Sequence, residues 1–398
     1  METIGDSRLR TAPGARAADS HVPAQALAPL LEEAARLVRS RPFRPHPRFA
    51  NGHAQTIYAA LAPRRDEPDA PHGVRRESRL FEVEPGVRVR LECRWQERPQ
   101  DGPTVIIIHG LEGSADSHYV RGTAAKAVAA GFNAVGFNMR NCGGTEHLTP
   151  TLYHSGLTSD IHRVLVGLAE QDGLAEIYLA GFSMSGNMVL KLAGEYRGEV
   201  PSALGGVAAV SPSIELNACA AHIERRANWL YRQSFMRSLR RRVRKKRALY
   251  PDLYDTRGLW RVRTVRQFDE RFTAPAGGYA DATDYYDRAS SLPVIADIRV
   301  PTLVLHAEDD PIIPAAPFRE PFIAANPDVL LVLTRRGGHV GFVADPAAAA
   351  GEDARWAENR VVEFFRLLSQ TRAGAASPAG GPAPGAATDS TAGGGRAD

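Results

Sequence analysis

Cysteines, long apolar runs and an N-terminal targeting signal are all scarce or missing in this sequence. Its 398 residues include three cysteines, Cys93, Cys142 and Cys219, which lack any CxxC spacing. This pattern argues against a disulfide framework and a zinc cluster, and it favours a reducing compartment. No stretch of about 18 apolar residues is present, and the first residues lack the basic and apolar regions of a secretory signal. We therefore expect a cytoplasmic protein without a membrane span.

A large excess of one charge is also missing, since 49 Lys and Arg residues stand against 45 Asp and Glu residues. That balance argues against a nucleic-acid binder that works through bulk charge. The one strong cluster is RSLRRRVRKKR at residues 237–247, where eight of eleven side chains are cationic. Two interpretations remain open for it. In the first, it is a solvated helix face. In the second, it makes peripheral contact with anionic membrane, and each basic residue near the surface strengthens the attraction by about 1 kcal/mol.

The chain divides into five segments by composition and periodicity. Residues 1–41 are expected to form a tail followed by a short amphipathic helix, and residues 373–398, rich in Gly, Ala and Pro, are expected to form a disordered tail. Residues 42–213 and 295–372 carry strand patterns and form the two parts of one core. Residues 214–294 lack such patterns and are predicted to form a helical cap inserted over that core.

Strand patterns define the expected fold. Alternation in VRVRLECRW, residues 87–95, after Pro85 and Gly86, predicts an antiparallel hairpin. Short continuous apolar runs are typical of buried parallel strands, and helical stretches separate them here. The result is a mostly parallel, doubly wound α/β sheet, whose ligands bind beyond the carboxyl ends of the strands. The runs are TVIIIHG, FNAVGFNMR, EIYLAGFS, GGVAAVSPS, TLVLHAEDD and VLLVLTRRGGHV.

The stretch LAGFSMSGN, residues 179–187, closely matches the serine-hydrolase elbow GxSxG. A strand is expected to end at Gly181, Ser183 to occupy a sharp turn, and a helix to begin near Met184. Small residues two positions before and after the nucleophile let the two backbones approach closely. Ser185 stands where the last glycine belongs and is the rival nucleophile, but its own flanking positions hold Ser183 and Asn187. We predict Ser183 as the nucleophile.

A serine nucleophile needs a base, and the base needs an acid to orient it. GGHVGF places His339 after a late strand, and LHAEDDPIIP places Asp310 after an earlier one. The order Ser183, Asp310, His339 is that of the α/β-hydrolase fold. Asp309 is the rival acid and Glu308 a more distant one.

Two backbone N–H groups are predicted to stabilise the oxyanion of the reaction. In an α/β-hydrolase the loop after an early buried strand supplies one of them, and HGLEGS, residues 109–114, gives Leu111 as that donor. The residue after the nucleophile supplies the other, which is Met184. Its position at a helix start also favours negative charge.

With these motifs in order, the chain resembles the YheT-like α/β-hydrolases, bacterial relatives of the membrane-bound ABHD lipases and esterases. The resemblance spans about residues 42–370. The elbow departs from the family pattern, because Ser185 replaces the first glycine of a pair. The segments that support the resemblance are NGHAQTI, HGLEGSADSHYV, RNCGGTEH, LYHSGLTSD, GFSMSGN, SPSIELNAC, TVRQFDERFTAP, DYYDRASS, HAEDDPIIP and GGHVGF.

This resemblance implies an enzyme that cleaves carboxylic esters, either short- to medium-chain acyl esters or lipid esters, through an acyl-enzyme. No N-terminal anchor like that of the membrane-bound relatives is seen, which implies a soluble enzyme. No cofactor, metal or nucleic acid is expected as a partner. Two other functions stay open: an acyltransferase that uses the same triad, and a non-catalytic lipid-binding or interaction protein that retains the fold.

Overall fold

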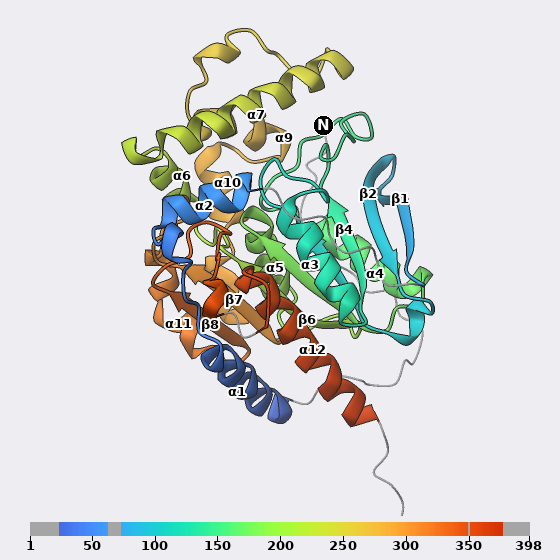
Figure 1. The fold of residues 1–398 in the computed structure, drawn as a ribbon. Helices are drawn as coiled ribbons and strands as arrows, with labels where there is room; N and C mark the ends of the chain where they lie inside the picture. Colours follow the sequence, from blue (N-terminus) through green and yellow to red (C-terminus); the bar gives the residue numbers. More distant parts are fainter. Residues whose placement is uncertain (1–23, 63–72, 349–350, 377–398) are drawn as a thin grey trace, which may run out of the picture.

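The computed structural model describes residues 24–62, 73–348 and 351–376. Within them lies one eight-stranded sheet with the order β1-β2-β4-β3-β5-β6-β7-β8 (Figure 1). β1 and β2 form an antiparallel hairpin, β2 is antiparallel to β4, and all other neighbours are parallel. The strands are β1 (Arg75–Glu84), β2 (Val87–Trp95), β3 (Thr104–Ile108), β4 (Asn133–Asn138), β5 (Ile177–Phe182), β6 (Leu204–Val210), β7 (Thr302–Ala307) and β8 (Val329–Thr334).

Helices cover both faces of the sheet. The central strands are buried on both sides, as expected for continuous runs of Val, Ile, Leu and Ala. Helices α1, α3 and α12 pack on one face, and α4 and α5 pack on the other. These helices are α1 (Ala24–Ser40), α3 (His118–Ala129), α4 (Thr158–Gln171), α5 (Met184–Glu195) and α12 (Trp356–Ala376).

Between β6 and β7 the described chain is helical and contains no strand. We call residues 214–294 the helical insertion. Figure 1 shows it at the top of the view, above the sheet, with α7 on the outside. Its helices are α6 (Leu216–Ile223), α7 (Trp229–Leu249), α8 (Val265–Phe268), α9 (Ala274–Ala276) and α10 (Ala282–Ala289), with a π-helical turn at Asp269–Thr273. Outside the insertion, α2 (Gly52–Leu61) precedes the hairpin and α11 (Pro321–Ala325) precedes β8.

The structure confirms the sheet and the amphipathic helix that the sequence predicts. Leu30, Leu31 and Ala34 of α1 are buried against the body, as the amphipathic pattern required. An apolar stripe on α12 is buried as well, and it includes Trp356, Val361, Phe364, Phe365 and Leu368. One boundary differs: α12 continues to Ala376, beyond residue 372, where the predicted core ends and the predicted tail begins. The rest of the predicted C-terminal tail, and residues 1–23, lie outside the described residues.

Candidate active site

Ser183 occupies a strained turn between β5 and α5. Its φ of 57° and ψ of −119° are unusual for a residue with a side chain. Gly181 makes this turn possible, because a Cβ added there would lie 2.4 Å from the Ser185 carbonyl oxygen. A Cβ on Gly186 would lie 2.9 Å from the Cβ of Pro212. Strand and helix therefore approach closely around Ser183, and its side chain lines the pocket described below.

Ser185 points the other way, into the protein. It is fully buried, its Oγ accepts the Phe182 N–H at 2.8 Å, and its hydroxyl donates to the Ile108 carbonyl at 2.7 Å. These bonds join the ends of β5 and β3. Ser185 is absent from the pocket lining. The replacement of the elbow glycine thus adds a structural hydroxyl and leaves the position of Ser183 unobstructed.

Ser183, His339 and Asp310 follow three different strands and are joined by hydrogen bonds. The Nε2 atom of His339 lies 2.9 Å from Ser183 Oγ, and its Nδ1 atom lies 2.8 Å from Asp310 Oδ2. The other oxygen of Asp310 accepts the N–H groups of Ile312 and Ile313 at 2.8 and 2.9 Å. Burial alone would raise the pKa of the Asp310 carboxyl. The positive charge of His339 and the hydrogen bond from its ring have a larger effect and hold that pKa below its usual value.

The rival acids lie elsewhere. Asp309 accepts the Gly338 N–H at 2.9 Å, so it supports the loop that carries His339 without contacting the imidazole. Glu308 pairs with Arg319 at 2.9 Å on the exposed side. Of the three candidate carboxylates, the structure brings Asp310 to His339.

Helix α2 braces the His339 loop, a role that the sequence did not assign to any residue. Thr56 Oγ1 accepts the His339 N–H at 2.8 Å and donates to the Gly52 carbonyl at 2.7 Å. Gln55 is fully buried and bonds both the N–H and the carbonyl of Val343. The signal in the sequence was the NGHAQTI segment, which supported the family resemblance but indicated no contact with His339.

The HGLEGS loop passes beside the serine. A Cβ added to Gly110 would lie 3.0 Å from the Ser183 Cβ. Leu111 and Met184 both line the pocket, and within the described part of the chain neither backbone N–H has a hydrogen-bond partner. Both N–H groups are therefore available to an oxygen atom bound in the pocket.

Buried His109 fixes the start of this loop. Its Nδ1–H donates to the Gly110 carbonyl at 2.7 Å, and its Nε2 accepts the Met139 N–H at 3.2 Å. Burial lowers the pKa of His109 to about 4, so the ring stays neutral and each nitrogen keeps one role. His109 therefore has a structural role.

The helical insertion holds the same loop from outside. Glu112, which has a φ of 60°, accepts the Tyr153 hydroxyl at 2.8 Å and Arg242 Nε at 2.6 Å. The Arg242 guanidinium also lies 4.9 Å from the centre of the Tyr153 ring. Arg242 thus joins α7 to the residue that follows Leu111.

This contact corrects the view of residues 237–247 as one exposed cluster. Arg242 and Lys246 are buried, and the Lys246 ammonium donates to the carbonyls of Glu146 and Thr149. Burial lowers the pKa of Lys246 to about 8. The exposed cations of the segment are Arg237, Arg241, Arg244, Lys245 and Arg247.

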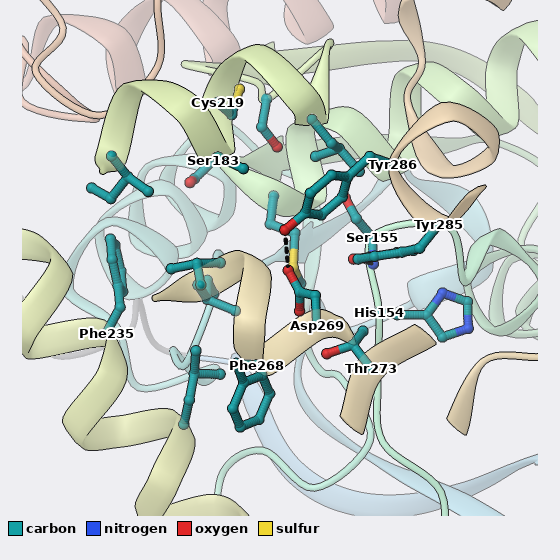
Figure 2. Close-up of a pocket in the computed structure, with 18 of the residues that line it drawn as sticks. His154, Ser155, Ser183, Cys219, Phe235, Phe268, Asp269, Thr273, Tyr285 and Tyr286 are labelled. Carbon is teal, nitrogen blue, oxygen red and sulfur yellow. Dashed lines mark hydrogen bonds between the residues drawn. The ribbon is translucent and has the colours of Figure 1, made fainter. Parts of the chain in front are cut away.

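A pocket of about 920 Å³, including its open mouth, lies between the sheet and the insertion with Ser183 in its wall (Figure 2). Most of its lining is apolar, with Leu216, Ile223, Phe235, Leu239 and Phe268 from the insertion and Ile312 from the core. Such a lining suits an acyl chain. Cys219 also borders it, and burial raises the pKa of that thiol well above its usual value, so it is unreactive.

A profile of the α/β-hydrolase fold matches residues 103–346. The chain belongs to the α/β-hydrolase family. It is 32% identical to the Escherichia coli protein YheT, which is named as an esterase, over 84% of this chain and 95% of that protein. Among solved structures, the Pyrococcus furiosus esterase Pf2001 shares the fold with a TM-score of 0.50 and 18% identity, over 78% of this chain and 96% of that one.

Lipid-related names occur among other relatives. The chain is 33% identical to a monoacylglycerol lipase of Saccharomyces cerevisiae over 67% of its length, and 31% identical to the human phospholipase ABHD3 over 61%. It spans about three fifths of each of those proteins, with 59% covered in both cases.

Membrane spans and metal sites are both missing from the described residues. No helix within these ranges combines the length and apolar character needed to span a membrane. No group of three or more His, Cys, Asp or Glu side chains in the described chain is arranged to hold a metal ion.

Proposed function

We propose that this protein is a serine hydrolase that cleaves carboxylic esters through an acyl-enzyme on Ser183. The observation that carries the proposal is the continuous hydrogen-bonded chain from Ser183 Oγ through His339 to buried Asp310, beside an apolar pocket. Membership of a family whose named relatives include esterases and lipases supports the same conclusion.

The reaction runs in two halves. Ser183 Oγ attacks the ester carbonyl carbon while His339 Nε2 takes its proton, and the carbonyl oxygen becomes an oxyanion held by the N–H groups of Leu111 and Met184. Collapse of this intermediate breaks the bond to the alcohol, which leaves with the proton from His339. Water then attacks the acyl-enzyme with His339 again as base, and the carboxylic acid leaves as Ser183 recovers its proton.

Asp310 acts by orientation. Its carboxylate holds the Nδ1–H tautomer of His339 and stabilises the imidazolium formed in each half reaction. Its hydrogen bonds to the N–H groups of Ile312 and Ile313 fix the carboxylate plane while it does so.

A panel of p-nitrophenyl esters of increasing acyl length tests the proposal. We expect hydrolysis with a preference for short- to medium-chain acids, because the pocket is of limited volume and largely apolar. Mass analysis of the products separates hydrolysis from transfer: an ester of an added alcohol as the main product would identify an acyltransferase instead. No turnover of any ester, together with no reaction with a fluorophosphonate, would identify a non-catalytic binding protein.

We further propose that the exposed arginines of α7 make peripheral contact with anionic membrane. Arg237, Arg241 and Arg244 are exposed, and each basic residue near an anionic surface contributes about 1 kcal/mol. The test is sedimentation with anionic and neutral vesicles at low and high salt. A variant with these three arginines changed to Gln should pellet less with anionic vesicles, while Arg242 is left intact because it is buried. Equal, negligible pelleting of the wild type with both vesicle types would contradict this proposal.

A further inference from the structure

A carboxylate that the proposed reaction does not require lies in the wall of the pocket that Ser183 also lines. Asp269 begins the π-helical turn of the insertion, is about nine tenths buried, and lines the same pocket as Ser183. π-helical turns are rare and occur frequently at functional sites. The ester cleavage described above uses Asp310 and leaves Asp269 without a role.

The contacts of Asp269 leave part of its hydrogen-bonding capacity unused. Tyr286 donates its hydroxyl to Asp269 Oδ2 at 2.7 Å, the Thr273 side chain also hydrogen-bonds the carboxyl group, and no ion pair to Asp269 occurs in the described chain. Arg266 acts from farther away, since its guanidinium lies over the Tyr286 ring, 5.0 Å from its centre. An ionised carboxylate has about four acceptor positions, and burying it with few partners is costly.

Other polar groups gather around Asp269. Figure 2 shows its carboxyl group joined to the Tyr286 hydroxyl, with Thr273, His154 and Tyr285 on the same side of the pocket, away from Phe235. The Tyr285 oxygen accepts the Ser155 N–H at 2.9 Å, which leaves its own hydroxyl hydrogen to donate. This side of the pocket therefore offers both a strong acceptor, Asp269, and a hydroxyl donor, Tyr285.

From this arrangement we infer that Asp269 and its hydroxyl neighbours bind a hydroxyl group of the substrate, and so select hydroxylated esters. A hydroxyl both donates and accepts, and it can use Asp269 and a tyrosine hydroxyl together, whereas an ammonium group can use only the acceptor. Arg242 also lines the pocket and disfavours a cation. The inference rests on the proposed ester cleavage and adds to it a class of substrate.

The substrate hydroxyl that binds Asp269 lies either on the alcohol part or on the acid part of the ester. Two matched pairs of substrates distinguish these two positions. The alcohol pair is 2,3-dihydroxypropyl butyrate and propyl butyrate. The acid pair is methyl 6-hydroxyhexanoate and methyl hexanoate. We expect the wild type to prefer the hydroxylated ester in one pair, and Asp269→Leu to lower kcat/KM for that ester by roughly 10- to 100-fold. The unsubstituted ester should change by less than about threefold, because it makes no bond to Asp269.

The ratio within each pair is the readout, since a purely structural role for Asp269 would lower both members equally. Asp269→Asn keeps the shape of the side chain and one acceptor oxygen, so it should lose less selectivity and serves if the Leu variant does not fold. Ratios unchanged by either variant in both pairs would overturn the inference. A preference for butyrylcholine over 3,3-dimethylbutyl butyrate that Asp269→Leu removes would assign the carboxylate to a cation and would also overturn it.

A binding assay keeps this test separate from the proposed reaction. In Ser183→Ala, which cannot turn over substrate, the preferred hydroxylated ester should raise the melting temperature more than its unsubstituted partner. The difference should vanish in the double variant with Asp269→Leu. Absence of turnover in the wild type combined with this binding difference would contradict ester cleavage but retain hydroxyl recognition, whereas equal shifts for both esters would contradict recognition alone.

Discussion

Two regions line the pocket, and they position their polar side chains differently. At the sheet edge, Ser183, Asp310 and His339 each follow a strand, and short loops fix them. In the insertion, Arg242 and Asp269 lie on helical segments between residues 214 and 294 and reach inward from them. In the proposed mechanism, the first region carries out the reaction, and the second shapes what the reaction acts on.

Two buried aspartates illustrate the difference. Asp310 faces the imidazole of His339 and backbone N–H groups, and its pKa is held low. Asp269 has hydroxyl partners instead, and burial raises its pKa to about 6 against the lowering by Thr273 and Tyr286. The same side chain therefore suits orientation of a base in one region and recognition of a polar group in the other.

Removing the charge of Asp310 should give the largest effect among the supporting residues. Asp310→Asn should lower kcat by up to roughly 10⁴, because an amide favours the wrong imidazole tautomer. Asp309→Asn is the matched control and should cost far less, since Asp309 contacts the Gly338 N–H and not the ring. Steady-state kinetics on one p-nitrophenyl ester measures both, and equal losses would contradict the assignment of the acid.

Breaking the contact between the two regions should have an intermediate effect. Arg242→Met leaves Glu112 without its cation and should displace the Leu111 loop, which lowers kcat by up to about 10², at the low end for loss of an oxyanion donor. Arg241→Met, on the exposed side of the same helix, should leave kcat unchanged.

Loss of a buried partner also destabilises a protein, so stability must be measured with activity. The double variant Glu112→Gln, Arg242→Met should recover part of the stability in urea unfolding, because it removes the unpaired charge. Suppose that Arg242→Met loses both stability and kcat, and that the double variant regains both. The loss of kcat is then caused by unfolding, and Arg242 does not position the Leu111 loop.

Ser185 should matter for stability and little for rate. Ser185→Ala removes the hydroxyl that bonds Phe182 and Ile108, which should lower the free energy of unfolding by about 1–3 kcal/mol. Activity should stay within a few-fold of wild type, since Ser185 lies outside the pocket lining. Urea unfolding measures the change in stability, and ester kinetics measures the change in activity. Unchanged stability with lost activity would contradict a structural role for Ser185 and indicate a catalytic one.

The sequence predicted the sheet but not the contacts that the insertion makes, for a physical reason. Parallel strands buried on both faces are continuous apolar runs, and the candidate triad residues follow where those runs end. Arg242 and Lys246 look like their exposed neighbours in RSLRRRVRKKR, because only packing against the Glu112 and Thr149 loops buries them.

Contacts across distant segments were equally hidden. Thr56 supports His339 from 283 residues away along the chain, and no local pattern reports such a bond. Asp269 lay inside a segment recognised by resemblance, TVRQFDERFTAP, yet its burial beside Ser183 depends on the fold of the whole insertion.

Covalent labelling by a fluorophosphonate tests the central claim most directly, because it reports an activated serine without assuming a substrate. Mass spectrometry of the intact protein should find one adduct on the wild type and on Ser185→Ala, and none on Ser183→Ala, although the last variant should unfold at the same urea concentration as the wild type. Labelling that persists in Ser183→Ala and disappears in Ser185→Ala would contradict Ser183 as the nucleophile.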